Sequence, residues 1–110
     1  MRLSAFVPVA LALFMLATPA RAITNEDVLS WSTEQRYTYM AASVEMVAFM
    51  ASVAGDRDRS RCIINWFFHD DSGTATIYNA MHEFLDHTPQ TLIYLLINRQ
   101  CGEPTAAAGQ

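Results

Sequence analysis

The histidines and acids of residues 82–87 (HEFLDH) are the side chains of this chain best suited to chemistry. A helical zinc site requires histidines four positions apart on one face. Here the histidines are five positions apart, so on a helix they point about 140° away from each other. His82 and Asp86 have the required spacing, but a catalytic zinc needs three protein ligands. We therefore expect no metal site and interpret the run as a polar helix face, its histidines favoured by the dipole at the helix C-terminus.

A second group, His69 with Asp70 and Asp71, could in principle transfer protons. General acid–base chemistry needs a nucleophile held within reach of its base, and the neighbouring sequence offers none. Adjacent carboxylates in a loop are more often simply solvated. The chain contains only four glycines, too scattered for a loop that cradles phosphate. We therefore predict a protein that is not an enzyme and that carries no cofactor.

The N-terminal segment, residues 1–22, has the features of a secretory signal peptide. Arg2 supplies the positive charge, residues 5–17 are apolar apart from Pro8, and residues 20–22 (ARA) form a small-x-small cleavage site. The apolar run is shorter than the roughly 20 residues needed to cross a bilayer. We expect cleavage after Ala22 and export to the periplasm, with no membrane association afterwards. An uncleaved membrane anchor is the alternative.

The exported chain would comprise residues 23–110, which are 88 residues and enough for one small domain. We expect a helical domain over residues 23–102 and a flexible tail over residues 103–110. Five arginines then oppose eleven acidic residues, a net charge of −6, and the chain has no lysine. This balance argues against nucleic acid and anionic membranes as partners and suits a basic protein partner or simply solubility.

Two cysteines, Cys62 and Cys101, lie in the exported part. An even cysteine count in a short exported chain predicts a disulfide. The alternative, a reactive thiol pair, lacks the Cys-x-x-Cys spacing that lowers a thiol pKa. Closing this loop should stabilise the domain by about 4 kcal/mol in the chain-entropy model.

Helix start and stop signals divide the rest of the chain into an all-α domain of four or five helices. Thr24 followed by acids predicts a short helix over residues 25–31. Ser32 and Gln35, at capping-box spacing, open a long helix that should end at Gly55. We expect Thr74 to begin a helix that ends at residue 86. Thr88 and Pro89 begin the last helix, with residues 92, 93, 95, 96 and 97 as its core.

Two segments have less definite signals. Residues 55–61 (GDRDRSR) alternate in charge and are interpreted as a solvated loop, with a polar contact surface as the alternative. Residues 62–68 (CIINWFF) fit a strand or a short helix. Because one strand cannot form a sheet, we predict a packed turn or short helix held by the disulfide.

The long helix is apolar on nearly all sides. Tyr37, Met40 and Val44 begin one apolar face, and Met46, Phe49 and others occupy most of the rest. Such a helix is buried on more than one side. It is therefore either the central helix of the domain or one that also meets another chain, including a second copy in a homodimer.

A homodimer seam or a partner interface would account for this surplus of apolar residues, and packing of all of it inside the domain is the alternative. The aromatic residues beside the acidic loop are the candidate contacts, because aromatic anchors next to carboxylates suit a basic cleft. We predict as partner-binding residues Trp66, Phe67, Asp70 and Asp71.

The same order of features occurs in a known family. The matching features are residues 27–31 (DVLSW), Tyr37, the helix over residues 41–54, Cys62 after a charged loop, residues 83–89 (EFLDHTP), and Cys101. In this order, residues 24–102 resemble the small periplasmic immunity proteins of the Rap/Tai type, which protect bacteria from amidase effectors of type VI secretion. The resemblance implies a fold and a role and assigns no contact residue.

The resemblance implies that the domain binds a secreted peptidoglycan amidase and blocks its catalytic cleft. One alternative is a periplasmic acid-stress chaperone of the Hde type, which is also small, exported, helical and held by one disulfide. Eleven acids would lose charge together on acidification, as such a chaperone requires, although the lysines typical of that class are missing. A small secreted binding protein with another partner is the third possibility.

Overall fold

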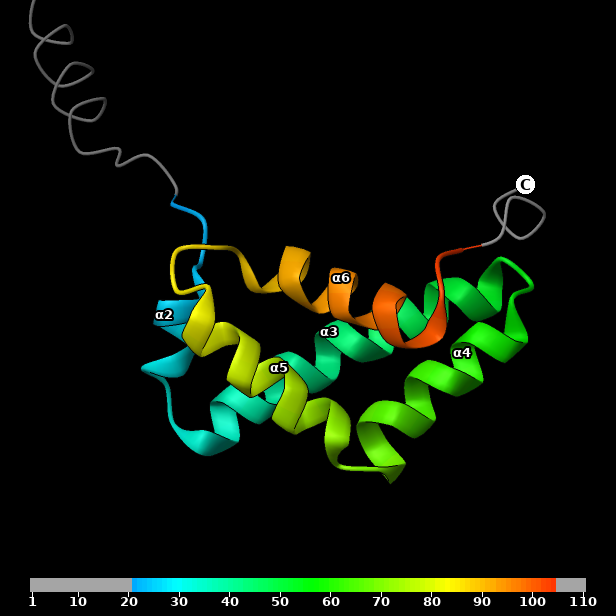
Figure 1. Ribbon diagram of the computed structural model, residues 1–110, viewed down its shortest axis with the longest axis horizontal. Coiled ribbons are helices and arrows are strands. Elements are labelled where there is room, and N and C mark those ends of the chain that lie inside the picture. Colours follow the sequence, from blue (N-terminus) through cyan, green and yellow to red (C-terminus); the bar gives the residue numbers. More distant parts are fainter. Residues whose placement is uncertain (1–20, 105–110) are drawn as a thin grey trace, which may run out of the picture.

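The computed structural model describes residues 21–104 and builds them entirely from helices and short connections (Figure 1). The predicted signal peptide, apart from residues 21 and 22, and the tail beyond residue 104 lie outside the described residues. No strand occurs within residues 21–104, so the predicted all-α class is confirmed. The helices are α2 (Asn25–Leu29), α3 (Thr33–Val53), α4 (Arg57–Ile64), the π-helix η2 (Asn65–His69), α5 (Ser72–Glu83) and α6 (Pro89–Cys101).

The long helix α3 forms one layer, and α5 and α6 cross it on the side that faces the viewer in Figure 1. Helix α3 packs against α4 and α6, while α2 packs against α5. Between these layers lies one core, whose buried side chains come from every helix. Its members are Val28, Met40, Val44, Ala48, Ile63, Trp66, Phe67, Ile77, Met81, Leu92, Ile93 and Ile97.

Helix α2 begins as the sequence predicts, with a capping box at Thr24. The Thr24 hydroxyl accepts from the N–H of Asp27, and the Asp27 carboxylate accepts from the N–H of Thr24 at 2.9 Å. The helix ends at Leu29, two residues earlier than expected. Asn25 is buried because its N–H donates to the His87 carbonyl, at 2.8 Å, and its side-chain amide donates to the Phe84 carbonyl, at 2.7 Å. The first helix is thereby tied to the loop that follows α5.

Helix α3 also has the predicted ends. The Ser32 hydroxyl accepts from the N–H of Gln35, and Gly55 follows the last turn with a φ of 85°. Its buried residues lie on one face, whereas Met46, Phe49 and their neighbours on the opposite face are exposed. The single chain buries α3 on one face, so the alternative of a central helix is wrong, and contact with another chain stays a prediction.

The charged segment 55–61 is not a solvated loop, and this prediction is corrected. Asp56 caps α4 by accepting from the N–H of Arg59, and the helix then runs to Ile64. The alternating charges suggested that every charged side chain faces solvent. Arg59 instead turns inward, and its guanidinium binds the end of α6. Sequence periodicity does not reveal such a long-range anchor.

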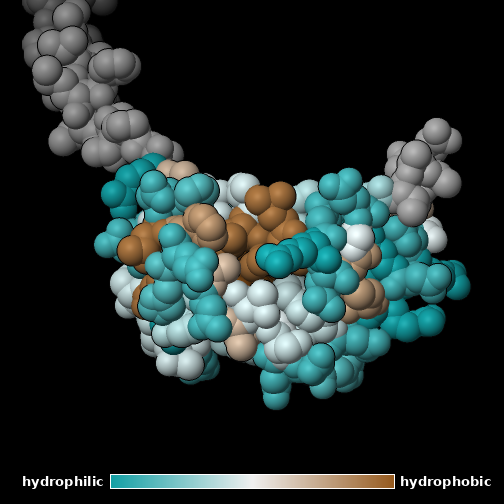
Figure 2. Space-filling model, in the orientation of Figure 1, coloured by the Kyte–Doolittle hydropathy of each residue, from teal (hydrophilic) through white to brown (hydrophobic). Residues whose placement is uncertain are grey.

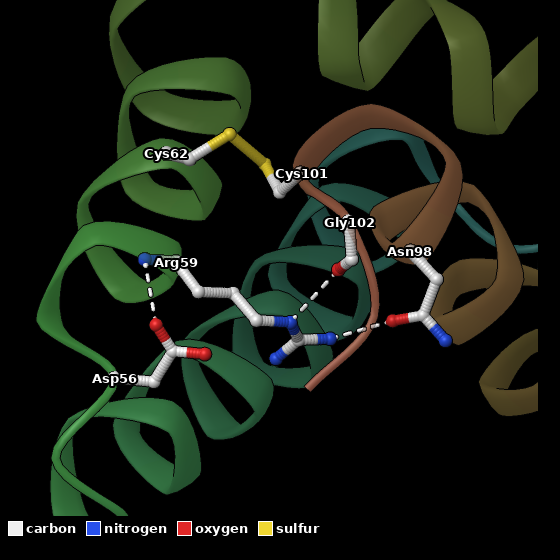
Figure 3. The surroundings of a disulfide bond; sticks show 6 residues. All are labelled: Asp56, Arg59, Cys62, Asn98, Cys101 and Gly102. Atoms are coloured by element: carbon white, nitrogen blue, oxygen red, sulfur yellow. Dashed lines mark hydrogen bonds between the residues drawn. A yellow bond between two sulfur atoms is a disulfide. The ribbon is translucent and has the colours of Figure 1, made fainter. Parts of the chain in front are cut away.

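The predicted disulfide between Cys62 and Cys101 is present and joins α4 to the last residue of α6 (Figure 3). Its two Cα atoms are 5.8 Å apart. The segment after Cys62 completes α4 and widens into η2, which agrees with the predicted short helix rather than with a strand.

Helix α5 starts and ends earlier than predicted. It begins at Ser72 rather than Thr74 because the chain turns sharply at Asp71, and it ends at Glu83. His82 therefore lies on the helix while Asp86 lies beyond it, so the helical spacing expected for this pair is wrong. Helix α6 begins at Pro89 as predicted, but Leu95 is exposed and does not belong to the core.

Candidate partner-binding surface

The two aromatic residues predicted to contact a partner lie in the core. Trp66 is 6% exposed and Phe67 is 1% exposed. They are buried because η2 turns both rings inward, Phe67 stacking on Tyr37 with the centroids 5.7 Å apart. The prediction of these two residues as surface anchors is therefore wrong for the folded domain. They support the surface from beneath.

Asp70 and Asp71, the two predicted acidic contacts, are exposed at the junction between η2 and α5. Asp71 has a φ of 31° and is the one non-glycine residue within residues 21–104 with a positive φ. It occupies the N-cap position of α5, yet its side chain accepts no hydrogen bond from that helix. A residue that adopts an unfavourable backbone conformation without local compensation is a candidate for function.

Asp71 stands at the edge of an open groove between α3 and α5. The groove holds about 440 Å³, and two tyrosines, Tyr37 and Tyr78, form part of its walls. We call it the Asp71 groove; it is lined by Thr33, Arg36, Tyr37, Met40, Asp71, Thr74, Ala75 and Tyr78. Sequence reasoning found Asp71 but missed the tyrosines, which are 41 positions apart in the chain.

The walls of the Asp71 groove are held by contacts beneath and beside them. Tyr37 rests on the buried Phe67 ring. The Arg36 guanidinium lies 4.8 Å from the centroid of the Tyr78 ring and donates to the Leu29 carbonyl at 3.2 Å. A cation over a tyrosine face is a favourable arrangement. Because these side chains have partners, the groove is a preformed surface.

The charge distribution of the Asp71 groove leaves its carboxylate available. Within residues 21–104 the Asp27 carboxylate pairs with Arg21 and the Asp86 carboxylate contacts the His87 ring, and neither contact involves Asp71. Arg36 is engaged with Tyr78 and Leu29 instead. A free carboxylate beside exposed tyrosine suits a basic side chain of a partner, with its methylene groups on the ring and its charge at the acid.

Residues 82–87, considered in the sequence as a metal site, are divided between the end of α5 and the loop that follows it. His82 packs edge-on against Tyr78, with centroids 4.7 Å apart. The His87 ring lies 3.0 Å from the Asp86 carboxylate. No group of three or more potential metal ligands occurs among the residues that the structure describes.

Apolar surface is also exposed elsewhere on the domain. On α3, Met46, Phe49, Met50 and Val53 share the face opposite the core, and each is more than half exposed. Figure 2 shows a further gathering of apolar side chains over α6 and the end of α5, where Phe84, Leu85 and Leu95 are exposed. The sequence signalled the first of these surfaces through the second apolar face of its long helix.

Comparison of the chain with protein-family models, with curated proteins and with solved structures gave no match. Within the described residues, no helix combines the length and the apolar character needed to cross a membrane.

Proposed function

We propose that this protein is an exported immunity protein that binds a secreted peptidoglycan amidase in the periplasm and blocks its catalytic cleft. The observation that carries the binding role is the Asp71 groove, a preformed surface in which Asp71 has a positive φ and an unpaired carboxylate beside exposed tyrosine. The choice of an amidase as partner rests on the order of features that resembles the Rap/Tai-type proteins.

The proposed contact is between Asp71 and a basic side chain of the amidase. Tyrosine and arginine are enriched among residues that dominate binding energy, and the groove contains Tyr37, Arg36 and Tyr78. The net charge of −6 after export, from five arginines and eleven acids, would attract a basic surface over a longer range. A partner loop seated in the groove would be fixed by one ion pair and two aromatic rings.

The test is a binding measurement between the chain, expressed from its full sequence for export, and a secreted peptidoglycan amidase of the same organism. Asp71→Asn removes the charge and keeps the shape, so we expect affinity to fall about tenfold or more. Glu83→Gln is the matched control, because it removes the same charge from the other end of α5. We expect this control to bind within about twofold of the wild type.

Three outcomes would contradict the proposal. The amidase could fail to bind the wild-type chain, or both variants could bind equally well. The third outcome is protection of unfolded client proteins from aggregation at low pH, with no amidase binding, which would favour the chaperone alternative. Mass measurement of the free protein in solution reports in the same samples whether a homodimer forms.

A further inference from the structure

A second groove lies at the other end of α3 and shares no residue with the Asp71 groove. It holds about 220 Å³ between the second half of α3, the start of α4 and α6. Two exposed methionines and one tyrosine give it apolar walls, and one arginine lines it. We call it the Arg59 groove; its lining includes Met46, Met50, Ala54, Asp56, Arg59 and Tyr94.

Arg59 is unusual because it carries a charge and is only 6% exposed. Its Nε donates to the Gly102 carbonyl at 3.0 Å, and its Nη2 donates to the Asn98 side-chain oxygen at 2.6 Å (Figure 3). Both acceptors are neutral. Within residues 21–104 no carboxylate lies within 4.0 Å of this guanidinium, and its Nη1 has no hydrogen-bond partner there.

A buried guanidinium whose acceptors are both neutral favours the binding of an anion. Arginine stays protonated in proteins, so burial cannot neutralise it as it can neutralise lysine. Burying a charge is costly unless an opposite charge or a full set of hydrogen bonds compensates. The two neutral acceptors use the Nε and Nη2 donors of the guanidinium. Nη1 is left to donate to a ligand in the groove that Arg59 lines.

The walls determine what kind of anion would fit. Met46 and Met50 have flexible, polarisable side chains that adapt to apolar ligands of irregular shape. One acid, Asp56, also lines the groove and opposes an anion there. Its carboxylate is occupied as the cap of α4, accepting from the N–H of Arg59 at 3.4 Å. The cationic side chain thus lies among apolar walls, a combination that matches a carboxylate attached to an alkyl chain.

We propose that the Arg59 groove binds the anion of a medium-chain fatty acid. The carboxylate accepts from Nη1 of Arg59, and the alkyl chain lies between the methionines of α3 and Tyr94 of α6. The groove volume of about 220 Å³ admits a short acyl chain, and octanoate is the probe ligand of that kind. This proposal is independent of the amidase, since it uses neither Asp71 nor its tyrosines.

The test is a titration of the full-sequence exported protein with octanoate at neutral pH, followed by calorimetry and by the NMR signals of the Met50 methyl and Arg59 Nε–H groups. 1-Octanol and octylamine, which have the same chain without the negative charge, are the comparison ligands. We expect one octanoate site, at least tenfold weaker binding of octanol, and no site for octylamine. Because the protein is acidic overall, nonspecific binding would favour the opposite order.

Variants of an exposed groove residue avoid disturbing the fold. Met50→Glu places a negative charge in the groove and should weaken octanoate binding at least tenfold, while Met50→Lys should strengthen it. Phe49→Glu and Phe49→Lys are the matched controls, since Phe49 is an exposed neighbour on α3 that does not line the groove. We expect both controls to bind within about twofold of the wild type.

Asp56→Asn provides a further variant, because asparagine caps helices as well as aspartate does. Removing this charge should tighten octanoate binding. The proposal is overturned if octanol binds as well as octanoate, if no saturable site appears below the micellar concentration, or if Met50→Glu and Phe49→Glu weaken binding equally.

Discussion

At the scale of single residues, Asp71 combines a stability cost with an exposed chemical group. Its φ of 31° is expensive for a residue with a Cβ atom. The chain adopts it because α5 must start close against η2. A Cβ atom on Gly73 would lie 2.8 Å from the Trp66 carbonyl oxygen, so the backbones approach closely at this junction. Asp71 bears the resulting turn, and its carboxylate is left facing outward at the groove.

Replacing Asp71 with glycine should separate stability from binding. Asp71→Gly relieves the left-handed strain, which we expect to raise the free energy of unfolding by about 1 kcal/mol. The same variant removes the carboxylate and should weaken the amidase complex as Asp71→Asn does. Urea unfolding and calorimetric binding measure the two effects. A glycine variant that is less stable than the wild type would contradict the strain argument.

The close approach at Gly73 leads to a second prediction. Gly73→Ala adds a methyl group against the Trp66 backbone and ring, where no flexible side chain can yield. We expect a loss of about 1–3 kcal/mol in unfolding free energy, the usual range for overpacking. Gly55→Ala is the comparison variant. The space around Gly55 is open, so any loss of unfolding free energy in this variant comes from its positive φ alone. Thermal melts compare the two.

Predictions about single residues were correct where they depended only on residue type and on neighbours in the sequence. The cysteine pair and the exposure of Asp70 and Asp71 required only composition and spacing. The placement of Trp66 and Phe67 could not be predicted, because an aromatic run beside an acidic loop looks the same whether the π-helix turns its rings inward or outward. Tyr37 and Tyr78 line one groove only through the fold, because they belong to different helices.

At the scale of helices, α4 depends on two anchors at the end of α6. Arg59 binds the Gly102 carbonyl and Asn98, and Cys62 is bonded to Cys101 one turn later. Removing the disulfide by Cys62→Ser with Cys101→Ser frees a loop closed by residues 39 positions apart. We expect a loss of about 4 kcal/mol in the chain-entropy model.

Hydrogen exchange would locate this loss as well as measure it. The amides of α4 should lose protection before those of α3, because α4 is a short helix whose anchors lie in α6. Reduction of the wild-type protein is the matching treatment without mutation. Unchanged stability in both cases would contradict the role assigned to the disulfide.

Helix α2 should respond to acid through its capping box. At this cap the backbone N–H of Thr24 donates to the Asp27 carboxylate, and the Thr24 hydroxyl accepts from the N–H of Asp27. The bond from the Thr24 N–H is the main cause that lowers the pKa of Asp27 below its ordinary 3.8. A lowered folded-state pKa adds stability that is complete above 3.8 and is lost as the pH falls through the lower value.

Asp27→Asn should therefore flatten the acid side of the stability profile. Between about pH 5 and pH 2 the wild type should lose more unfolding free energy than the variant does. Carboxyl NMR titration of Asp27 measures its pKa directly. A value at or above 3.8 would contradict the capping-box argument.

Four helix boundaries were predictable from caps in the local sequence. Thr24, Ser32, Gly55 and Pro89 mark helix ends through side-chain or backbone chemistry within a few residues. Helix α4 was missed although Asp56 caps it locally, because the contacts that hold it come from residues about 40 positions away. The start of α5 was misplaced because Asp71 caps it through backbone position and not through a side-chain hydrogen bond.

At the scale of the whole molecule, α3 presents one apolar face to the core and another to the outside. Met40 lies on the core face and is 2% exposed, whereas Met46 lies on the outer face and is 59% exposed. Met40→Ala should cost about 2–5 kcal/mol of unfolding free energy. Met46→Ala should change it by less than about 0.5 kcal/mol. Equal losses in urea unfolding would mean that the outer face is covered in solution, as in a homodimer.

The central claim is that this small helical domain acts by binding and blocking an amidase through the Asp71 groove. The most direct measurement is peptidoglycan hydrolysis by a secreted amidase of the same organism, with increasing amounts of this protein. We predict that hydrolysis ceases at one domain per amidase and that Asp71→Asn requires at least tenfold more protein, while Glu83→Gln behaves as the wild type. Undiminished hydrolysis at a molar excess of the wild-type protein would contradict the account.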